Sequence, residues 1–307
     1  MRLRLAAFLL SAVSVWAQNS PPAAKPARPY ADVDHVVIIS MDGMRPDRLL
    51  LANMPTVRGL IARGAYSFWA RTTAVSITLP SHVSMLTAVT PRKHGIEWNR
   101  DLPLKEPVYP NVPTIFEMAR RAGYTTAMAT GKSKFAAVNK PGTIQYLYLP
   151  AEDDDSNDNA VAAAEKLIAE HQPEVLFVHL PEVDLRGHKY GWASAEQFAA
   201  IERTDGHIKR ILDAIALAGL AEHTVVFLTS DHGGAGKTHG PDDPRSRHIP
   251  WIVTGPHVKH GDLTGDADLV INTEDTCATA CYLLGLSQLP YFDGKPVLAA
   301  FENPPAP

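Results

Sequence analysis

Short apolar runs alternate with amphipathic stretches along most of the chain. The apolar runs have the length of buried strands and read HVVIIS (35–40), YTTAMAT (124–130), EVLFVHL (174–180), TVVFLTS (224–230) and IPWIVTG (249–255). The amphipathic stretches between and after them predict helices over 54–64, 112–123, 159–171, 193–217 and around Cys277. Because continuous apolar strands that alternate with helices are typical of sheets covered on both sides, we predict an α/β fold. Its doubly wound, mainly parallel sheet has helices on both faces.

The two ends of this pattern indicate where the domain lies. Residues 1–17 combine the basic Arg2 and Arg4, an apolar run and small residues before Gln18, which is typical of a cleaved signal peptide. Residues 18–32 are rich in Pro and Ala and predict a linker. We therefore expect one catalytic domain over 33–303, no transmembrane anchor after signal cleavage, and a secreted or periplasmic protein.

Composition excludes two classes of protein. The 29 basic and 33 acidic residues among 307 are well mixed and leave a net charge of −4, so the chain offers no nucleic-acid-binding surface. Its two cysteines, Cys277 and Cys281, lie on one apolar helix face. We expect buried free thiols there rather than a disulfide framework.

Aspartates and histidines follow three of the predicted strands. The carboxyl ends of parallel strands form the usual ligand edge of such a sheet, so these side chains are expected to meet. They are Asp42, Asp184, His188, Asp231, His232 and His239.

Each of these residues alone also suits a turn or a helix cap. Together, three carboxylates and three imidazoles match the ligands that zinc or manganese accepts. Six ligands are too many for one tetrahedral ion with an open position but suit two ions. Two metals about 3.5–4 Å apart can stabilise both oxygens of an in-line displacement at phosphorus.

The segment SITLPSH (76–82) offers a hydroxyl group for such a reaction. Proline is favoured in the first turn of a helix, so we predict a helix that starts at Pro80, with Thr78 just outside its N-terminus. Free N–H groups and the helix dipole favour a phosphoryl group at that place. From the residues alone, Thr78 is equally a helix cap, and Ser76 and Ser81 are rival nucleophiles.

Five motifs in order carry a resemblance to a known family. They read SMDG, SITLPSHVSMLTAVTPRKHGI, VDLRGHKYG, SDHGG and KTHG. This set resembles the type I phosphodiesterase/nucleotide pyrophosphatase family of the alkaline phosphatase superfamily, from about Asp42 to the run IPWIVTGP, and the last helix with DGKPV is similar to the end of that superfamily.

The resemblance implies roles for particular residues. One Zn²⁺ would be held by Asp184, His188 and His239. The other would be held by Asp42, Asp231 and His232 together with the nucleophile.

In the family pattern T-x-P-x-H the nucleophile is the Thr, which is Thr78 here, and Asn99 matches the residue that stabilises a phosphoryl oxygen. The implied reaction is phosphoric ester hydrolysis through a phosphothreonine intermediate, with net retention at phosphorus. The related sulfatases need Cys or Ser at the position of Thr78 and Arg at that of His82, so this chemistry is not expected.

Substrate preference stays open between three classes of protein. A diesterase or nucleotide pyrophosphatase with some monoesterase activity, acting on a small phosphate ester, is the first hypothesis. Lys132 and Lys134 resemble the basic pair with which phosphonoacetate hydrolases bind a substrate carboxylate, so a phosphonate C–P hydrolase is the alternative. A binding protein in which the metals only stabilise the fold is the non-enzymatic alternative.

We expect the remaining histidines, among them His82, His94, His179 and His248, to be packed or surface residues, with His82 and His94 near enough to orient ligands.

Overall fold

A single sheet organises the protein. The computed structural model describes residues 24–99, 108–266 and 268–306. The strands of this part of the chain lie in the order β4-β3-β5-β1-β6-β7-β2-β8. They are β1 (His35–Met41), β2 (Ala65–Arg71), β3 (Thr126–Thr130), β4 (Tyr146–Tyr148), β5 (Val175–Leu180), β6 (Thr224–Thr229), β7 (His248–Thr254) and β8 (Gly261–Asp262). Only β7 runs antiparallel to its neighbours among the described strands, which confirms the mainly parallel sheet.

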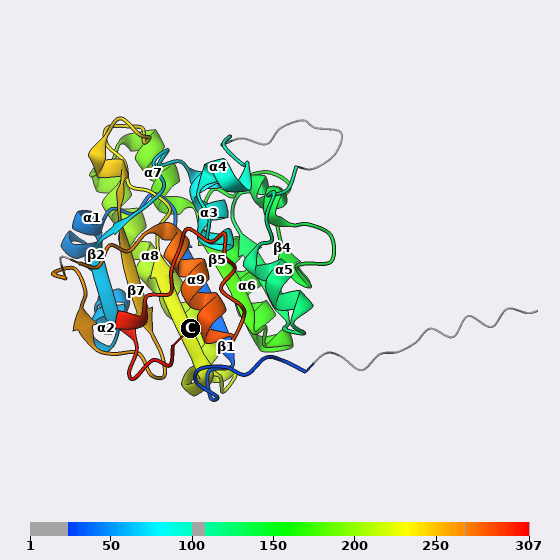
Figure 1. Ribbon diagram of the computed structural model, residues 1–307. Helices are drawn as coiled ribbons and strands as arrows, with labels where there is room; N and C mark the ends of the chain where they lie inside the picture. The colour runs from blue at the N-terminus through cyan, green and yellow to red at the C-terminus, as the bar shows by residue number, and fades with distance from the viewer. Residues whose placement is uncertain (1–23, 100–107, 267, 307) are drawn as a thin grey trace, which may run out of the picture.

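Helices cover both faces of this sheet (Figure 1). One face packs against α3 (Thr78–Thr87), α5 (Ile115–Arg121) and α9 (Thr273–Leu283). The other packs against α1 (Pro46–Leu51), α2 (Pro55–Arg63), α6 (Asp158–His171) and α8 (Ala195–Leu217). The shorter helices are α4 (Pro91–His94), α7 (Glu182–Tyr190) and the 3₁₀ helices η1 (Ser133–Val138), η2 (Ala221–His223), η3 (Pro244–Ser246) and η4 (Leu298–Ala300).

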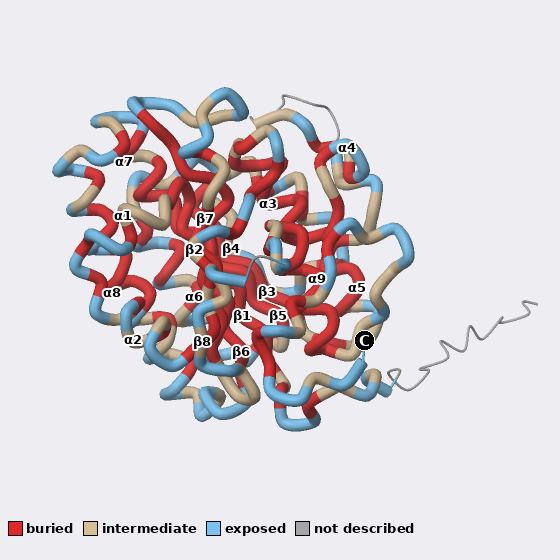
Figure 2. The backbone as a smooth tube through the Cα atoms, turned by 60° about the vertical axis from the view of Figure 1, so that its left-hand side comes forward, coloured by how far each residue is buried: buried red, intermediate tan, exposed pale blue. Residues whose placement is uncertain are grey.

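Strand β1 shows why the apolar runs are continuous. Val36 and Ile38 belong to the core beneath α3 and α9, whereas Val37, Ile39 and Met41 belong to the core beneath α2 and α8. Successive side chains of a strand point to opposite faces, so a strand covered on both faces is apolar at every position. Figure 2 accordingly shows buried backbone along the centre of the sheet, with exposed segments at the periphery.

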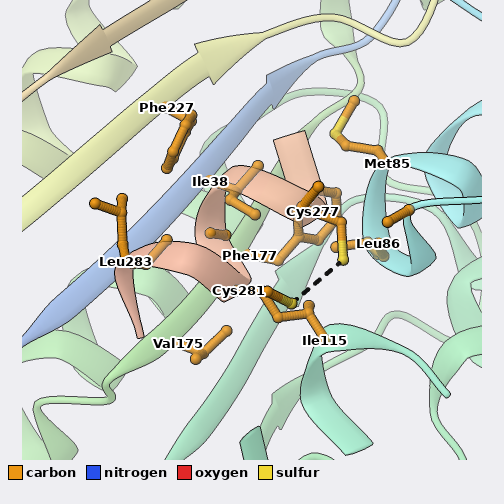
Figure 3. Packing of buried hydrophobic residues seen from close by; sticks show 14 of the residues in the cluster. Ile38, Met85, Leu86, Ile115, Val175, Phe177, Phe227, Cys277, Cys281 and Leu283 are labelled. Carbon is orange, nitrogen blue, oxygen red and sulfur yellow. Dashed lines mark hydrogen bonds between the residues drawn. The ribbon is translucent and has the colours of Figure 1, made fainter. Parts of the chain in front are cut away.

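Helix α9 places both cysteines inside one of these cores. Figure 3 shows Cys277 and Cys281 among side chains of the sheet, including Phe177, and of α3, including Leu86. The two sulfur atoms are 4.0 Å apart, and both thiols are free and buried, as predicted. Burial raises the pKa of the Cys277 thiol well above its usual value. Both buried side chains pack as small apolar groups.

The start of α3 and the strand β2 are among the local features that differ from the prediction, as are the short strands β4 and β8. Helix α3 begins at Thr78 rather than Pro80, with Ile77 in extended conformation before it. Proline fits inside the first turn because the N–H groups there have no partner within the helix. The second difference is β2, which the apolar pattern did not predict because its sequence AYSFWAR carries an exposed Trp69 and an irregular register between Ser67 and Ala70.

The ends of the chain bear on the predicted boundaries. The proposed signal peptide lies outside the described residues. Within the proposed linker, Tyr30 is buried and stacks on His257. None of the helices among the described residues has the length and apolarity that a membrane span requires.

Candidate metal and phosphoryl site

The carboxyl ends of the parallel strands bring the predicted ligands together. Asp42 follows β1 directly, and Asp231 and His232 come just after β6. Asp184 and His188 lie one turn apart on α7, which begins two residues after β5. All three aspartates are buried, with 2% exposure at most. A buried cluster of carboxylates is costly to fold, which makes it a candidate functional site.

Each aspartate has one oxygen without a hydrogen-bond partner. These buried atoms are Asp42 Oδ1, Asp184 Oδ1 and Asp231 Oδ2. The opposite oxygens have donors: Asp231 Oδ1, for example, accepts the backbone N–H of Gly43 at 3.1 Å. Buried polar atoms are nearly always partnered, so three open carboxylate oxygens in one place suit a cation.

The histidines point lone pairs at these oxygens. In His188, His232 and His239 the Nδ1 atom lies 2.8–3.0 Å from a backbone carbonyl, which only accepts, so Nδ1 carries the proton. In the neutral ring Nε2 then has no hydrogen and is free to bind a metal, which is the arrangement usual in metal-binding histidines.

Two groups of ligand atoms result. Asp184, His188 and His239 form the first, with His188 Nε2 at 3.3 Å and His239 Nε2 at 3.7 Å from Asp184 Oδ1. Asp42, Asp184 and His232 form the second, in which His232 Nε2 lies 3.3 Å from Asp42 Oδ1. Asp231 adjoins the second group, since its Oδ2 lies 3.2 Å from His232 Nε2. Unprotonated nitrogens that face carboxylate oxygens repel each other unless a cation lies between them, so the residues fit metal ions.

The pKa shifts of the three aspartates differ in direction, being upward for Asp231 and downward for Asp42 and Asp184. Burial raises the pKa of Asp231 well above its usual range, and the charges of Asp42 and Asp184 raise it further. Burial acts in the same direction on Asp42, but the Lys132 ammonium together with His179 and His232 outweighs it, and the pKa of Asp42 lies well below its usual range. Burial and the neighbouring His239 lower the pKa of His232 to about 3, which keeps its ring neutral.

Thr78 faces this cluster from the first position of α3. Its Oγ1 lies 3.2 Å from His232 Nε2, and it is 1% exposed. Its side chain does not cap the helix, because the cap residue is Ile77, whose side chain makes no capping hydrogen bond. The hydroxyl therefore lies beside the metal ligands and the N-terminus of a helix, where a phosphoryl group is favoured.

The rival hydroxyls are turned elsewhere. Ser76 donates to the carbonyl of Thr73 from a backbone with φ of 48°, and the Ser81 hydroxyl bonds to those of Thr72 and Thr73. Asn99 lies at the start of the helix, where its Oδ1 accepts the backbone N–H of Leu79 at 2.9 Å. That bond orients the side-chain amide at the entrance of α3.

The two lysines predicted to bind substrate have different surroundings. Lys132 follows β3, is 3% exposed, and its Nζ lies 2.6 Å from Oδ2 of both Asp42 and Asp184. Lys134 lies at the start of η1 and donates to the backbone carbonyl of Asn99 at 3.1 Å. The sequence pattern placed both lysines at this edge, and the structure adds which groups they contact. Their role toward a substrate stays a prediction.

Two further histidines support the site. His179, on β5, lies with Nε2 3.0 Å from Asp42 Oδ2, and His82 Nδ1 lies 2.8 Å from the Thr78 carbonyl. His82 also approaches Asp231 Oδ2 at 3.4 Å. Sequence reasoning grouped His179 with packed or surface residues. The available signal was an imidazole in the otherwise apolar run VLFVHL, one position before the strand ends.

Known proteins resemble the chain in both sequence and fold. The family model "Type I phosphodiesterase / nucleotide pyrophosphatase" matches residues 36–242. Bovine bis(5'-adenosyl)-triphosphatase ENPP4 is 27% identical over 213 residues, which cover 64% of this chain and 47% of that protein. Human ectonucleotide pyrophosphatase/phosphodiesterase family member 1 is 24% identical over 223 residues, 64% of this chain and 23% of that protein. The chain thus spans less than half the length of these curated relatives.

Solved structures agree on the fold. Murine ectonucleotide pyrophosphatase/phosphodiesterase 5, inactive and in complex with AMP, superposes with a TM-score of 0.73 at 16% identity, covering 88% of this chain and all of that one. A 2-O GAG sulfatase superposes with a TM-score of 0.69 at 14% identity, covering 90% of this chain and 74% of that one. The sheet, the ordered motifs and these matches together show that the chain belongs to the type I phosphodiesterase/nucleotide pyrophosphatase family and has the alkaline phosphatase-like fold.

Proposed function

We propose that the protein is a metal-dependent phosphoric ester hydrolase that acts on phosphodiesters or nucleotide pyrophosphates. The observation that carries the proposal is the set of open carboxylate oxygens faced by the Nε2 atoms of histidines, with a threonine hydroxyl 3.2 Å from one of those nitrogens. A protein whose metals only stabilise the fold has no need of a hydroxyl beside the metal ligands.

Two metal ions, most simply Zn²⁺, would share the ligands. Asp184, His188 and His239 would hold one. The other would be held by Asp42, Asp231 and His232, with the Thr78 hydroxyl beside them. When bound, the ions lower the pKa of a coordinated hydroxyl and neutralise the charge that develops on phosphoryl and leaving-group oxygens.

The protein's own groups then account for a two-step reaction. Thr78 Oγ1 attacks phosphorus, the bond from phosphorus to the leaving oxygen breaks, and a phosphothreonine forms. Water then attacks the same phosphorus, which releases phosphate or a phosphomonoester and restores the threonine hydroxyl. Two displacements give net retention. Asn99 serves as donor to a phosphoryl oxygen, because the Leu79 N–H occupies its Oδ1 and directs its amide group away.

The substrate class follows from the relatives. Those named above are a bis(5'-adenosyl)-triphosphatase and ectonucleotide pyrophosphatases/phosphodiesterases. We therefore place nucleotide esters first among the substrates of this chain, with monoesters as slower ones. The family's ectoenzymes and the N-terminal pattern of residues 1–17 support export to the periplasm or the medium. Residues 33–303 form the proposed catalytic domain.

Replacing the proposed nucleophile tests the mechanism. Thr78→Ala is expected to lower kcat/KM for bis-p-nitrophenyl phosphate by on the order of 10³ or more, since no other group forms the intermediate. Thr78→Ser keeps a hydroxyl and retains measurable turnover. The matched control is Ser76→Ala, which removes a buried hydroxyl two residues away that bonds to a backbone carbonyl and leaves kcat/KM within about tenfold.

The same preparation is measured for metal content and substrate range. The proposal fails if the active protein contains no divalent metal or if Thr78→Ala hydrolyses the diester at the wild-type rate. Comparing the diester, p-nitrophenyl phosphate, a dinucleoside polyphosphate and phosphonoacetate ranks the substrate classes. Phosphonoacetate at the head of that ranking would replace the diesterase assignment by the C–P hydrolase alternative.

A further inference from the structure

Lys132 connects the two groups of metal ligands. Its Nζ lies 2.6 Å from Asp42 Oδ2 and 2.6 Å from Asp184 Oδ2, and the side chain is buried. Both contacts use the oxygen opposite the open one, because Oδ1 of each aspartate has no hydrogen-bond partner. His179 also approaches Asp42 Oδ2, at 3.0 Å. The two carboxylates are therefore held through Oδ2, and their open Oδ1 atoms lie toward the histidine nitrogens.

Lys132 is also the permanent cation of the cluster. Among the residues that the structure describes, the other ion-pair partners of Asp42, Asp184 and Asp231 are all histidines. Three of them, His188, His232 and His239, direct Nδ1 to a backbone carbonyl and Nε2 to the aspartates. Asp42 and Asp184 thus share one ammonium group at contact distance, and burying an unpaired charge is strongly destabilising.

We infer that Lys132 is a built-in counter-cation that keeps the metal-free site folded and orients one ligand of each metal group. It is a positioning residue, acting through Asp42 and Asp184 rather than through the substrate. The inference rests on the proposed function, since it requires that the open oxygens receive metal ions.

The counter-cation role predicts that Lys132 and the metal ions substitute for each other. Without metal, the ammonium is the main source of positive charge for the carboxylates, so its removal lowers the stability of the protein by the full amount. With metal, the same carboxylates are neutralised from the other side, and removal of the ammonium lowers the stability less. A side chain that only fills space would contribute equally in both conditions.

The experiment compares melting temperatures with and without Zn²⁺. Lys132→Met keeps an unbranched side chain that is one atom shorter and removes its charge. We expect the Tm of the metal-free protein to fall by on the order of 10 °C and that of the Zn²⁺-loaded protein by less than half as much. The matched control is Lys134→Met, the same change two residues away at a lysine that contacts the Asn99 carbonyl, and it should lower both Tm values equally.

A second variant keeps the test decisive if Lys132→Met does not fold without metal. Adding Asp184→Asn to Lys132→Met removes one negative charge together with the positive one, and the metal-free Tm should rise again. Folding of Lys132→Met only when Zn²⁺ is supplied supports the inference. Equal Tm losses with and without Zn²⁺, or no recovery in the double variant, overturn it.

The outcomes are separable from those of the proposed function. If the wild-type Tm does not respond to Zn²⁺ or any other divalent metal, the metal-site proposal fails before Lys132 is considered. If Lys132→Met leaves both Tm values unchanged and raises KM for phosphonoacetate or the diester, Lys132 binds substrate directly and the counter-cation role is wrong.

Discussion

Buried aspartates occur in two kinds of surroundings in this protein. Asp205, on α8, accepts the backbone N–H groups of Thr56 and Val57 at the start of α2, one with each oxygen. Asp275, on α9, likewise accepts from the backbone of Asn272 and Lys295. At the edge of the sheet, by contrast, Asp42 and its two neighbours each keep one oxygen open.

The difference separates carboxylates that stabilise the fold from carboxylates that are available to bind a ligand. Asp205 satisfies two N–H groups that have no partner within their own helix, and its charge complements the helix dipole. The open oxygens at the sheet edge stabilise nothing within the chain. Burial alone, which is similar in both places, does not distinguish them, whereas the hydrogen bonding of each oxygen does.

Exchanging Asp for Asn should have opposite effects in the two surroundings. Asp231→Asn should lower kcat/KM by roughly 100-fold or more, because an anionic ligand beside His232 is lost. It should leave the metal-free protein as stable as before or more so, since the charge of Asp231 is repelled by its neighbours.

Asp205→Asn should do the opposite. An amide has one acceptor oxygen for two N–H groups, so the free energy of unfolding should fall by about 1–3 kcal/mol with kcat/KM unchanged. Urea unfolding of the chelated proteins and steady-state kinetics measure both quantities. A metal-free Asp231→Asn protein that loses as much stability as Asp205→Asn would remove the distinction.

Metal removal should destabilise the protein through the open oxygens alone. A ligand at a hundredfold excess over its Kd stabilises the native state by about 2.7 kcal/mol, so two sites give roughly 5 kcal/mol. EDTA should therefore lower Tm and abolish hydrolysis, and Zn²⁺ should restore both. Asp205→Asn should show the same EDTA-dependent shift as the wild type, because its carboxylate takes no part in the site. A wild-type Tm that is indifferent to EDTA would contradict the comparison.

Glu274 offers the smallest test, as a buried carboxyl of α9 outside the site. Burial, with the charges of Asp275 and Asp293, raises the pKa of Glu274 to about 7. A folded-state pKa above the unfolded one means that the stabilising contribution is complete below pH about 4.5 and is lost as pH rises through 7. Glu274→Gln should therefore raise the free energy of unfolding by about 1–3 kcal/mol at pH 8 and leave it unchanged near pH 4. Equal effects at both pH values would show that charge is not involved.

Much of this architecture was predictable from the pattern of apolar residues. The runs that became β1, β3, β5, β6 and β7 are apolar because both of their faces are covered, and that requirement is visible residue by residue. Strand β2 was not predictable in the same way, because Trp69 is 57% exposed and the register is irregular. The start of α3 was misplaced by two residues, because Pro80 is compatible with several positions in a first turn.

The site divides in a similar manner. The six Asp and His residues could be selected because each follows a strand, and strand ends meet at one edge of a parallel sheet. The part played by His179 was not predicted, because it lies inside β5 rather than after the strand end, where ligands were sought. Lys132 was predictable as a basic residue at this edge, but nothing in the motif indicates that its ammonium faces two carboxylates rather than the solvent.

By itself, the sequence determined the layers of the fold, the order of the motifs and the residue types that gather at the carboxyl ends of the strands. These follow from local periodicity and chain order. Tertiary structure alone decided which carboxylate oxygens stay open, which nitrogen of each histidine carries the proton, and where Lys132 points. Such features depend on donors and acceptors supplied by distant segments, and local spacing carries no information about them.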